Sequence, residues 1–116
     1  MLFKKPEDTD KFSWTKHIKE KMKFYGLSES RLKRVLRNPV RQEKGIAPGT
    51  VAIMQRAGTK KHPTEIWLMY QIVRIKKKER IRMISAWRYP GISPIGEEIP
   101  IPEDILKELD GLIEKK

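Results

Sequence analysis

The stretch WTKHIKEKMKFYGLSESRLKRVLRNPVR (14–41) determines the expected fold, because it encodes two short amphipathic helices separated by one turn. The first helix should begin at Ser13, whose hydroxyl can accept a first-turn amide, and end at Gly26, a residue that readily forms a left-handed C-cap. Ser28 should cap the second helix, and Asn38 should end it because it precedes a proline. Two helices of roughly three turns cannot bury their apolar faces alone, so we expect a sheet to cover them.

The residues after this helical pair supply the strands of that sheet. TVAIMQR (50–56), EIWLMYQIVRI (65–75) and IRMISAWR (81–88) are rich in β-branched and aromatic residues, as strands are. KKKER (76–80) should form the hairpin tip between the last two, and VRQEKG (40–45) a short strand or an extended link. We therefore predict an α+β fold in which two N-terminal helices pack on a three- to four-stranded antiparallel sheet.

Composition divides the chain of 116 residues, which fits one domain. Residues 1–12 mix charges without a period and predict a loose N-terminal arm. Residues 13–89 predict the single α+β domain. Residues 90–116 predict a proline-rich strap followed by an acidic, amphipathic C-terminal helix that begins near Pro102.

The net charge of +11 is concentrated in the predicted domain. Residues 13–89 hold 20 Lys and Arg against 5 Asp and Glu, whereas residues 90–116 hold 3 against 7. A body this cationic is expected to attract polyanions, and nucleic acid before membrane. The alternative is a solvated surface whose charge serves solubility alone.

Several classes of protein are disfavoured by what the sequence lacks. There is no cysteine, which excludes a disulfide framework and a cysteine nucleophile. No apolar run approaches the roughly 20 residues of a membrane helix, and the first residues lack a signal-peptide core, so we expect a cytoplasmic protein without membrane contact. The acids are too dispersed for two-metal catalysis, and no cofactor motif is present, so we predict no metal and no cofactor.

The residues that could carry chemistry begin with His17, because imidazole titrates near neutrality and RNA cleavage needs proton transfer. Lys21 lies one helical turn away and could balance charge on a phosphorane. Arg88 and Tyr89 close the last predicted strand and Arg41 follows the helical pair, where guanidinium groups could bind phosphate and the phenol could stack or donate a proton. The other interpretation is that His17 hydrogen-bonds at the core edge, that Arg88 pairs with a glutamate, and that Tyr89 fills the core.

A second set of residues could grip a nucleic-acid backbone without catalysis. They are the outward-facing cations of the second predicted helix and of the hairpin tip: Arg31, Lys33, Arg34, Arg37, Lys76, Lys77 and Lys78. Phosphate contacts of this kind make affinity strongly salt-dependent.

The pattern H-x-x-x-K-M at His17, followed by Y-G-L-S and a helix ending in R-N-P, resembles a group of small phage- and bacterium-borne proteins. Their first helix carries H-x-x-x-[RK]-M and their second follows a G-[IL]-S turn. The group looks like part of the RelE/ParE- and BrnT-type toxin superfamily. The resemblance covers residues 14–42 by motif and residues 50–89 by element order.

This resemblance implies a RelE-like fold and a metal-independent endoribonuclease, an mRNA interferase-like toxin that acts on single-stranded or ribosome-bound RNA and is held inactive by an antitoxin protein. It places His17 and Lys21 on the group's histidine and arginine, and Arg88 on a last-strand arginine. The alternatives are a non-catalytic RNA- or DNA-binding module and a toxin-like partner of another protein.

The acidic C-terminal helix leaves two interpretations open. Its aliphatic residues could simply cover one face of the sheet. Its carboxylates could also lie over the basic face and compete with nucleic acid, as an antitoxin would; these are Glu103, Asp104, Glu108 and Asp110.

Overall fold

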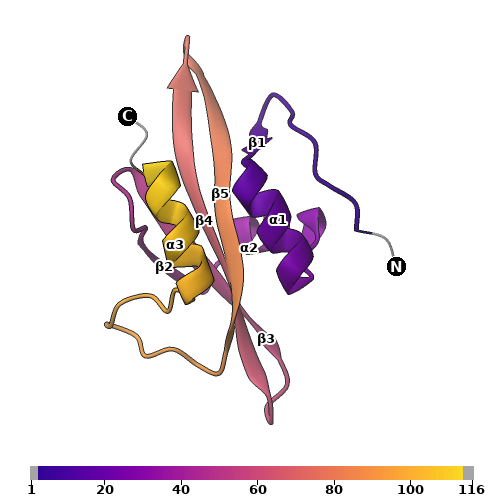
Figure 1. Cartoon of the computed structure of the whole chain (residues 1–116), viewed down its shortest axis with the longest axis vertical. Helices are drawn as coiled ribbons and strands as arrows, with labels where there is room; N and C mark the ends of the chain where they lie inside the picture. Colours follow the sequence, from indigo (N-terminus) through magenta and orange to yellow (C-terminus); the bar gives the residue numbers. More distant parts are fainter. Residues whose placement is uncertain (1–2, 114–116) are drawn as a thin grey trace.

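The structure is a computed structural model that describes the backbone of residues 3–113 and the side chains of residues 3–109. Within these residues it is an α+β fold with three helices and one five-stranded mixed sheet (Figure 1). The elements along the chain are β1 (Phe12–Trp14), α1 (Lys16–Tyr25), α2 (Glu29–Arg37), β2 (Arg41–Lys44), β3 (Thr50–Gly58), β4 (Pro63–Ile75), β5 (Lys78–Pro90) and α3 (Glu103–Ile113). The sheet order is β1-β5-β4-β3-β2, and only β1 runs parallel to its neighbour.

The two N-terminal helices end where the sequence predicts, but the first begins later. Gly26 terminates α1 with a φ of 68°, and the Ser28 hydroxyl caps α2 by accepting the amide of Arg31. The N-cap of α1 is Thr15, whose hydroxyl accepts the amide of Ile18 at 3.0 Å. The predicted start at Ser13 is wrong because that residue belongs to β1, which pairs with β5.

The sheet has more strands than the three or four predicted, and it is not purely antiparallel. The predicted meander of β3, β4 and β5 is confirmed, as is β2 in the segment 40–45. The extra strand is β1, whose three residues pair with Ile81–Met83. β1 is only three residues long and lies directly before the N-cap of α1. An alternation of side chains this short cannot be distinguished in the sequence from the first turn of the helix.

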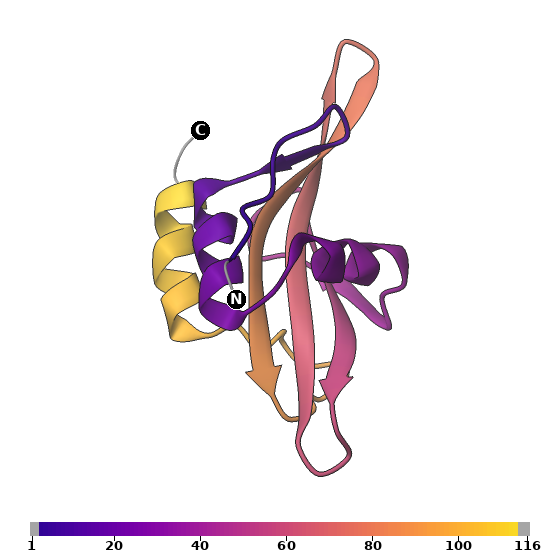
Figure 2. The same cartoon turned by 90° about the vertical axis from the view of Figure 1, so that its right-hand side faces the viewer.

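The two faces of the sheet bury separate apolar clusters. The first cluster, the helix-pair core, lies under α1 and α2, and its largest members are Trp14, Ile18, Met22, Leu27, Leu32, Ile53, Ile66, Leu68 and Met83. The second, the α3 core, lies under α3 and contains Ala52, Met54, Trp67, Met69, Ile84, Trp87, Ile105 and Leu109. Figure 2 shows α2 and α3 on opposite sides of the sheet, with α1 alongside α3.

The strap between β5 and α3 is fixed to the sheet by its backbone and by one side chain. Trp87 Nε1 donates to the carbonyl of Pro100 at 2.8 Å, and Ser93 is buried against Glu65. The strap thus delivers α3 to the face opposite α2. No helix in residues 3–113 is long and apolar enough to cross a membrane.

The β4–β5 hairpin extends beyond the rest of the sheet. The ladder between β3 and β4 ends at Thr50 and Gln71, whereas the ladder between β4 and β5 continues to Ile75 and Lys78. Residues 72–81, which we term the arm, lie beyond β3, and β1 still pairs with β5 at Ile81, so residues 73–80 form the two-stranded ribbon that projects from the body (Figures 1 and 2).

Candidate functional site

His17 lies on α1 between β5 and α3, and both of its ring nitrogens have partners. Nδ1 is 3.0 Å from Glu108 Oε1, and Nε2 is 2.8 Å from Ser85 Oγ. Because an ionised carboxylate only accepts hydrogen bonds, Nδ1 carries the proton and donates to Glu108, while the Ser85 hydroxyl donates to Nε2. The imidazole is therefore held as a neutral ring by β5 and α3, which both lie far from α1 in the sequence.

Lys21 and Tyr25 continue this contact along α1. Lys21 Nζ donates to Asp104 Oδ2 at 2.9 Å and to Glu108 Oε2 at 2.8 Å, and the Tyr25 hydroxyl donates to Asp104 at 3.2 Å. Three α1 residues spaced by four thus meet two α3 carboxylates spaced by four. We term these five residues the α1–α3 polar interface.

The ionisation of this interface follows from burial and from the pairing of opposite charges. Burial lowers the pKa of His17 and outweighs the effect of its hydrogen bond to Glu108, which favours the charged ring. Burial also works against the ammonium of Lys21, but its hydrogen bonds to Glu108 and Asp104 together raise its pKa. Burial and the charge of Asp104 raise the pKa of Tyr25 to about 12.

Both carboxylates remain ionised under ordinary conditions. The hydrogen bond from Lys21 lowers the pKa of Glu108, against a smaller effect of burial. Burial opposes ionisation of Asp104, yet its contacts with Lys21 and Tyr25 lower its pKa. The cationic group and the imidazole that the sequence singles out are therefore neutralised or occupied by α3.

Glu108, His17 and Ser85 follow the acid, imidazole, hydroxyl order of a serine hydrolase. Ser85 is fully buried in the interior of β5, however, and no substrate can reach its oxygen. Its hydroxyl serves instead to fix the orientation of the His17 ring.

Arg41 occupies a different part of the molecule and holds the strap. Its Nε donates to Glu43 at 2.8 Å, its Nη1 to Ser93 Oγ at 2.8 Å, and its Nη2 to the carbonyl of Glu97 at 3.1 Å. The guanidinium also lies over the ring of Trp67 at 5.3 Å. With four partners and little exposure, Arg41 has no free edge for a phosphate.

Glu65 completes this network, and sequence reasoning missed it. Its buried carboxylate accepts Trp67 Nε1 at 3.0 Å, the Ser93 amide at 2.9 Å and the Ser93 hydroxyl at 2.6 Å, with Arg56 at 3.8 Å. The available signal was an acid at the start of the apolar segment 65–75, because a carboxylate in such a strand needs donors. Its role is to anchor the strap on β4.

Arg88 and Tyr89 also stabilise the fold. Arg88 Nε donates to the carbonyl of Tyr25 at 3.1 Å and Nη2 to that of Gly26 at 3.4 Å, so the guanidinium caps the end of α1 rather than pairing with a glutamate. Tyr89 is half-buried against the α3 core. Of the predicted catalytic residues, only His17 and Lys21 share one cluster, because Arg41 lies on β2, three strands or about 14 Å from β5.

Three further arginines, which we term the guanidinium patch, come from α2 and β5: Arg31, Arg34 and Arg88. Arg31 and Arg34 lie one turn apart on α2. Burial lowers the pKa of Arg31, and the positive charges of Arg34 and Arg88 lower it further. Arg31 Nη1 donates to neutral Gln55 at 2.6 Å. Among residues 3–109, no carboxylate lies within 4.0 Å of any of the three.

The other residues predicted to contact nucleic acid differ in their exposure and in whether they already bind a partner within the fold. Arg37 is exposed one turn beyond Arg34 on α2. Lys33 pairs with Glu29 at 2.7 Å and lies over the ring of Phe12 at 4.8 Å, so its charge is partly neutralised within the fold. The three lysines of the arm, Lys76, Lys77 and Lys78, are exposed.

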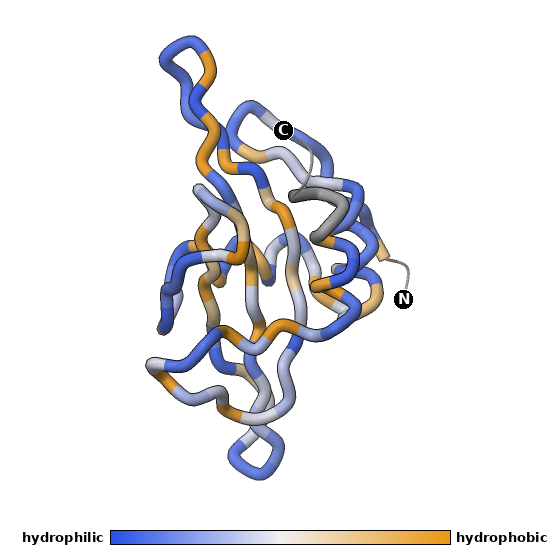
Figure 3. Tube along the Cα trace, turned by 60° about the vertical axis from the view of Figure 1, so that its left-hand side comes forward, coloured by the Kyte–Doolittle hydropathy of each residue, from blue (hydrophilic) through white to orange (hydrophobic). Residues whose placement is uncertain are grey.

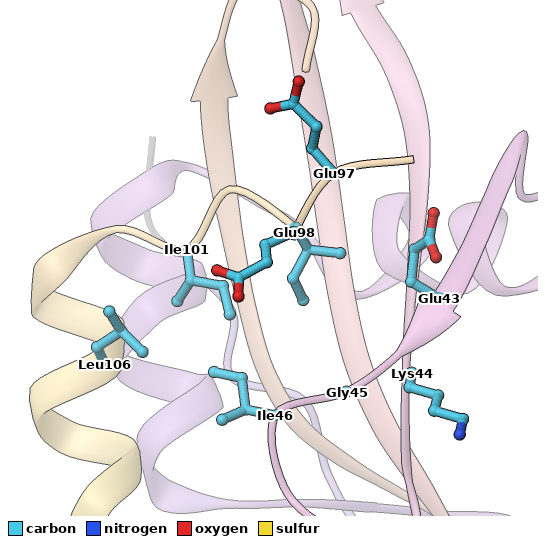
Figure 4. A pocket seen from close by; sticks show the side chains of 9 residues that line it. Glu43, Lys44, Gly45, Ile46, Glu97, Glu98, Ile101 and Leu106 are labelled. Atoms are coloured by element: carbon cyan, nitrogen blue, oxygen red, sulfur yellow. The ribbon is translucent and has the colours of Figure 1, made fainter. Parts of the chain in front are cut away.

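A groove of about 600 Å³ lies between the end of β2, the strap and α3 (Figure 4). Apolar and acidic side chains together line it: Glu43, Lys44, Gly45, Ile46, Glu97, Glu98, Ile99, Ile101 and Leu106. Its acids make it unsuited to phosphate, and it is separate from the guanidinium patch because it lies on the face of the sheet that α3 covers.

Comparisons of the chain with models of protein families, with curated protein sequences and with solved structures each find no match. The resemblance to the toxin superfamily therefore stays a prediction from the motif in residues 14–42.

Proposed function

We propose that this protein binds nucleic acid through the α2 side of its sheet, as a non-catalytic module. The observation that carries the proposal is the guanidinium patch, whose three arginines have no carboxylate within 4.0 Å among residues 3–109. Groups gathered in this way are stabilised by an anion, and guanidinium binds phosphate oxygens in a bidentate fork.

The surrounding charge supports the same partner. Arg37 extends the patch along α2, and the chain as a whole carries +11. Contacts of this kind position a phosphodiester backbone without reading its sequence. Phosphate contacts do not themselves distinguish RNA from DNA, and RNA as the target, a RelE-like fold and an antitoxin partner are predictions that rest only on the resemblance of residues 14–42.

The test is the salt dependence of binding in a variant that leaves the fold intact. Arg34→Gln with Arg37→Gln removes two exposed charges that make no salt bridge among the described residues. With labelled single-stranded RNA, the slope of log affinity against log salt should become less steep by about 1.4, or about 0.7 for each lost contact. Fluorescence anisotropy over a salt series measures it.

A matched control removes the same charge from the opposite side of the sheet. Lys44→Gln with Lys107→Gln should leave the slope unchanged, because these exposed lysines lie near the acidic groove and on α3. Equal losses in both double variants would show that net charge alone drives association, and a wild-type chain without affinity for nucleic acid would refute the proposal.

A metal-independent endoribonuclease is the second candidate, and one observation favours it. His17, Lys21 and Tyr25 place an imidazole, an ammonium and a phenol along one side of α1, and all three bind carboxylate oxygens. A phosphodiester could offer oxygens to the same groups. It would first have to displace Asp104 and Glu108.

A further inference from the structure

We infer that the arm enters the major groove of B-form duplex DNA. This inference rests on the proposed function and narrows the nucleic acid that the protein binds to one class. The arm carries five Lys or Arg and one Glu, and the flanking Arg82 brings the net charge of residues 72–82 to +5. Glu79 is paired with Arg74, and Arg80 donates to the carbonyl of Thr9. Within residues 3–109 the lysines of the tip have no carboxylate within 4.0 Å.

At the tip of the arm, two lysines adopt a backbone conformation that lysine rarely adopts. Lys76 and Lys77 form the two-residue turn between paired Ile75 and Lys78, with φ values of 49° and 70°. Such turns require positive φ at both central residues, which Asn and Gly adopt far more readily than lysine. Backbone strain of this kind is concentrated at functional positions, so the two lysines indicate a ligand for the tip.

The dimensions of the arm fit a groove that a ribbon can enter. Beyond the pairing of β1 with Ile81, three residues on each strand extend about 10 Å at about 3.3 Å per residue, which exceeds the roughly 8.5 Å depth of the B-DNA major groove. That groove is about 12 Å wide and admits a two-stranded ribbon. The major groove of A-form RNA is too narrow and deep for side chains to read.

Apolar side chains on the arm point to a base edge as well as to phosphates. Ile75 is 58% exposed on the projecting part of the ribbon, and Ile72 is 54% exposed at its base, on the opposite face. Figure 3 shows hydrophilic residues at the tip of the hairpin with hydrophobic segments directly beside them. Thymine methyl groups are the apolar feature of the major groove, and single strands would favour exposed aromatic rings, which the arm lacks.

The arm and the guanidinium patch can serve one duplex. Figure 2 shows that the arm leans toward the side of the sheet on which α2 lies. Cations on α2 would then contact the backbone next to the groove that the arm occupies, and backbone contacts of this kind set the register of a protein on DNA.

The decisive variant is Lys76→Asn with Lys77→Gly, which removes two charges and supplies the preferred turn residues. We expect a higher Tm and weaker binding to a labelled DNA duplex of 20 base pairs. The slope of log affinity against log salt should fall by about 1.8, so the ratio of variant to wild-type Kd is about tenfold larger at 50 mM than at 200 mM salt. Dimethyl sulfate should report protection of guanine N7, a major-groove atom, in the wild type and not in the variant.

The outcomes separate this inference from the proposed function. A variant that is more stable yet binds and protects the duplex like the wild type would overturn the arm's role, and so would wild-type affinity that is equal or higher for an RNA duplex or a single strand of the same sequence. If Arg34→Gln with Arg37→Gln weakens binding while the arm variant does not, the α2 surface binds nucleic acid without the arm. Absence of any binding would refute both.

Discussion

The imidazole of His17 is a poor general base in this arrangement because its lone pair is already engaged by the Ser85 hydroxyl. Its other nitrogen donates to Glu108. A proton can be added only by breaking the contact with Ser85 in a buried place, which is why burial lowers the pKa of His17. His17 is the first catalytic candidate in the sequence, but in the structure it connects α1 with β5 and α3.

This arrangement predicts that the fold loses stability in mild acid. The unfolded chain takes up a proton on His17 near its ordinary pKa of 6.5, whereas the folded chain does so only at lower pH. The unfolded state therefore binds more protons in that window, and the free energy of unfolding falls as pH drops below about 6.5. Asp104 and Glu108, whose pKa values are lowered, add a second loss below their ordinary values of 3.8 and 4.5.

Urea denaturation between about pH 8 and about pH 2 measures both losses. In His17→Gln the first loss should disappear and the second should remain. His62→Gln is the matched control, because His62 is exposed in the turn between β3 and β4 and should leave the profile unchanged. A first loss that persists in His17→Gln would assign it to another group.

At the scale of elements, α3 is bound to the body by apolar as well as ionic contacts. Leu109 is 1% exposed in the α3 core, whereas Leu106 on the same helix is 43% exposed beside the groove. We expect Leu109→Ala to lower the free energy of unfolding by about 2–4 kcal/mol, because it opens a cavity in a packed cluster. Leu106→Ala should cost less than about 1 kcal/mol.

Equilibrium urea denaturation compares the two variants directly. Similar small losses for both would mean that α3 is only loosely attached and that the second interpretation of the tail, a helix that competes with nucleic acid, is the better one. The position of Asp110, which that interpretation also used, lies outside the described side chains. Glu103 lies 3.8 Å from Lys107 of its own helix and is exposed.

The elements that could be predicted from the sequence are those with a local signal. Gly26, Ser28 and Asn38 determine the helix boundaries through backbone preferences, and the apolar segment 65–75 gives a central strand. β1 could not be predicted, because its three residues gain their pairing from β5, nearly seventy positions later.

The partners of the candidate residues were equally beyond local inference. His17 and Lys21 are neighbours by helical spacing, and that part of the site was predicted. Their carboxylate partners lie between 83 and 91 positions away, and their meeting depends on how the strap crosses the sheet. The same holds for Arg41, which bonds Ser93 of the strap, itself bound to Glu65 on β4.

At the scale of the whole molecule, the charges are divided between the two sides of the sheet. The α2 side carries the guanidinium patch, and the arm leans toward it (Figure 2). The opposite side carries α3 and the acidic groove with Glu97 and Glu98. A polyanion approaching this chain is therefore oriented toward α2, and away from His17 and Lys21.

This division predicts that the protein binds RNA without cutting it. Incubated with end-labelled single-stranded RNA in EDTA between pH 6 and pH 8, the wild-type chain should retard the RNA in a native gel and leave it intact in a denaturing gel. The reason is positional, since His17 is buried under α3 and in-line cleavage needs a general base within hydrogen-bond reach of the attacking hydroxyl.

Glu108→Gln sharpens this test because, among the described side chains, Glu108 is the one carboxylate that contacts both His17 and Lys21, while Asp104 still holds Lys21. We expect this variant to leave RNA intact as well, since the side-chain oxygen of a glutamine at position 108 can still accept a hydrogen bond from His17 Nδ1. Glu98→Gln, which removes an equal charge from the groove rim, is the control. Cleavage by the wild type would establish the endoribonuclease directly, and cleavage by Glu108→Gln alone would show that α3 suppresses a site on α1.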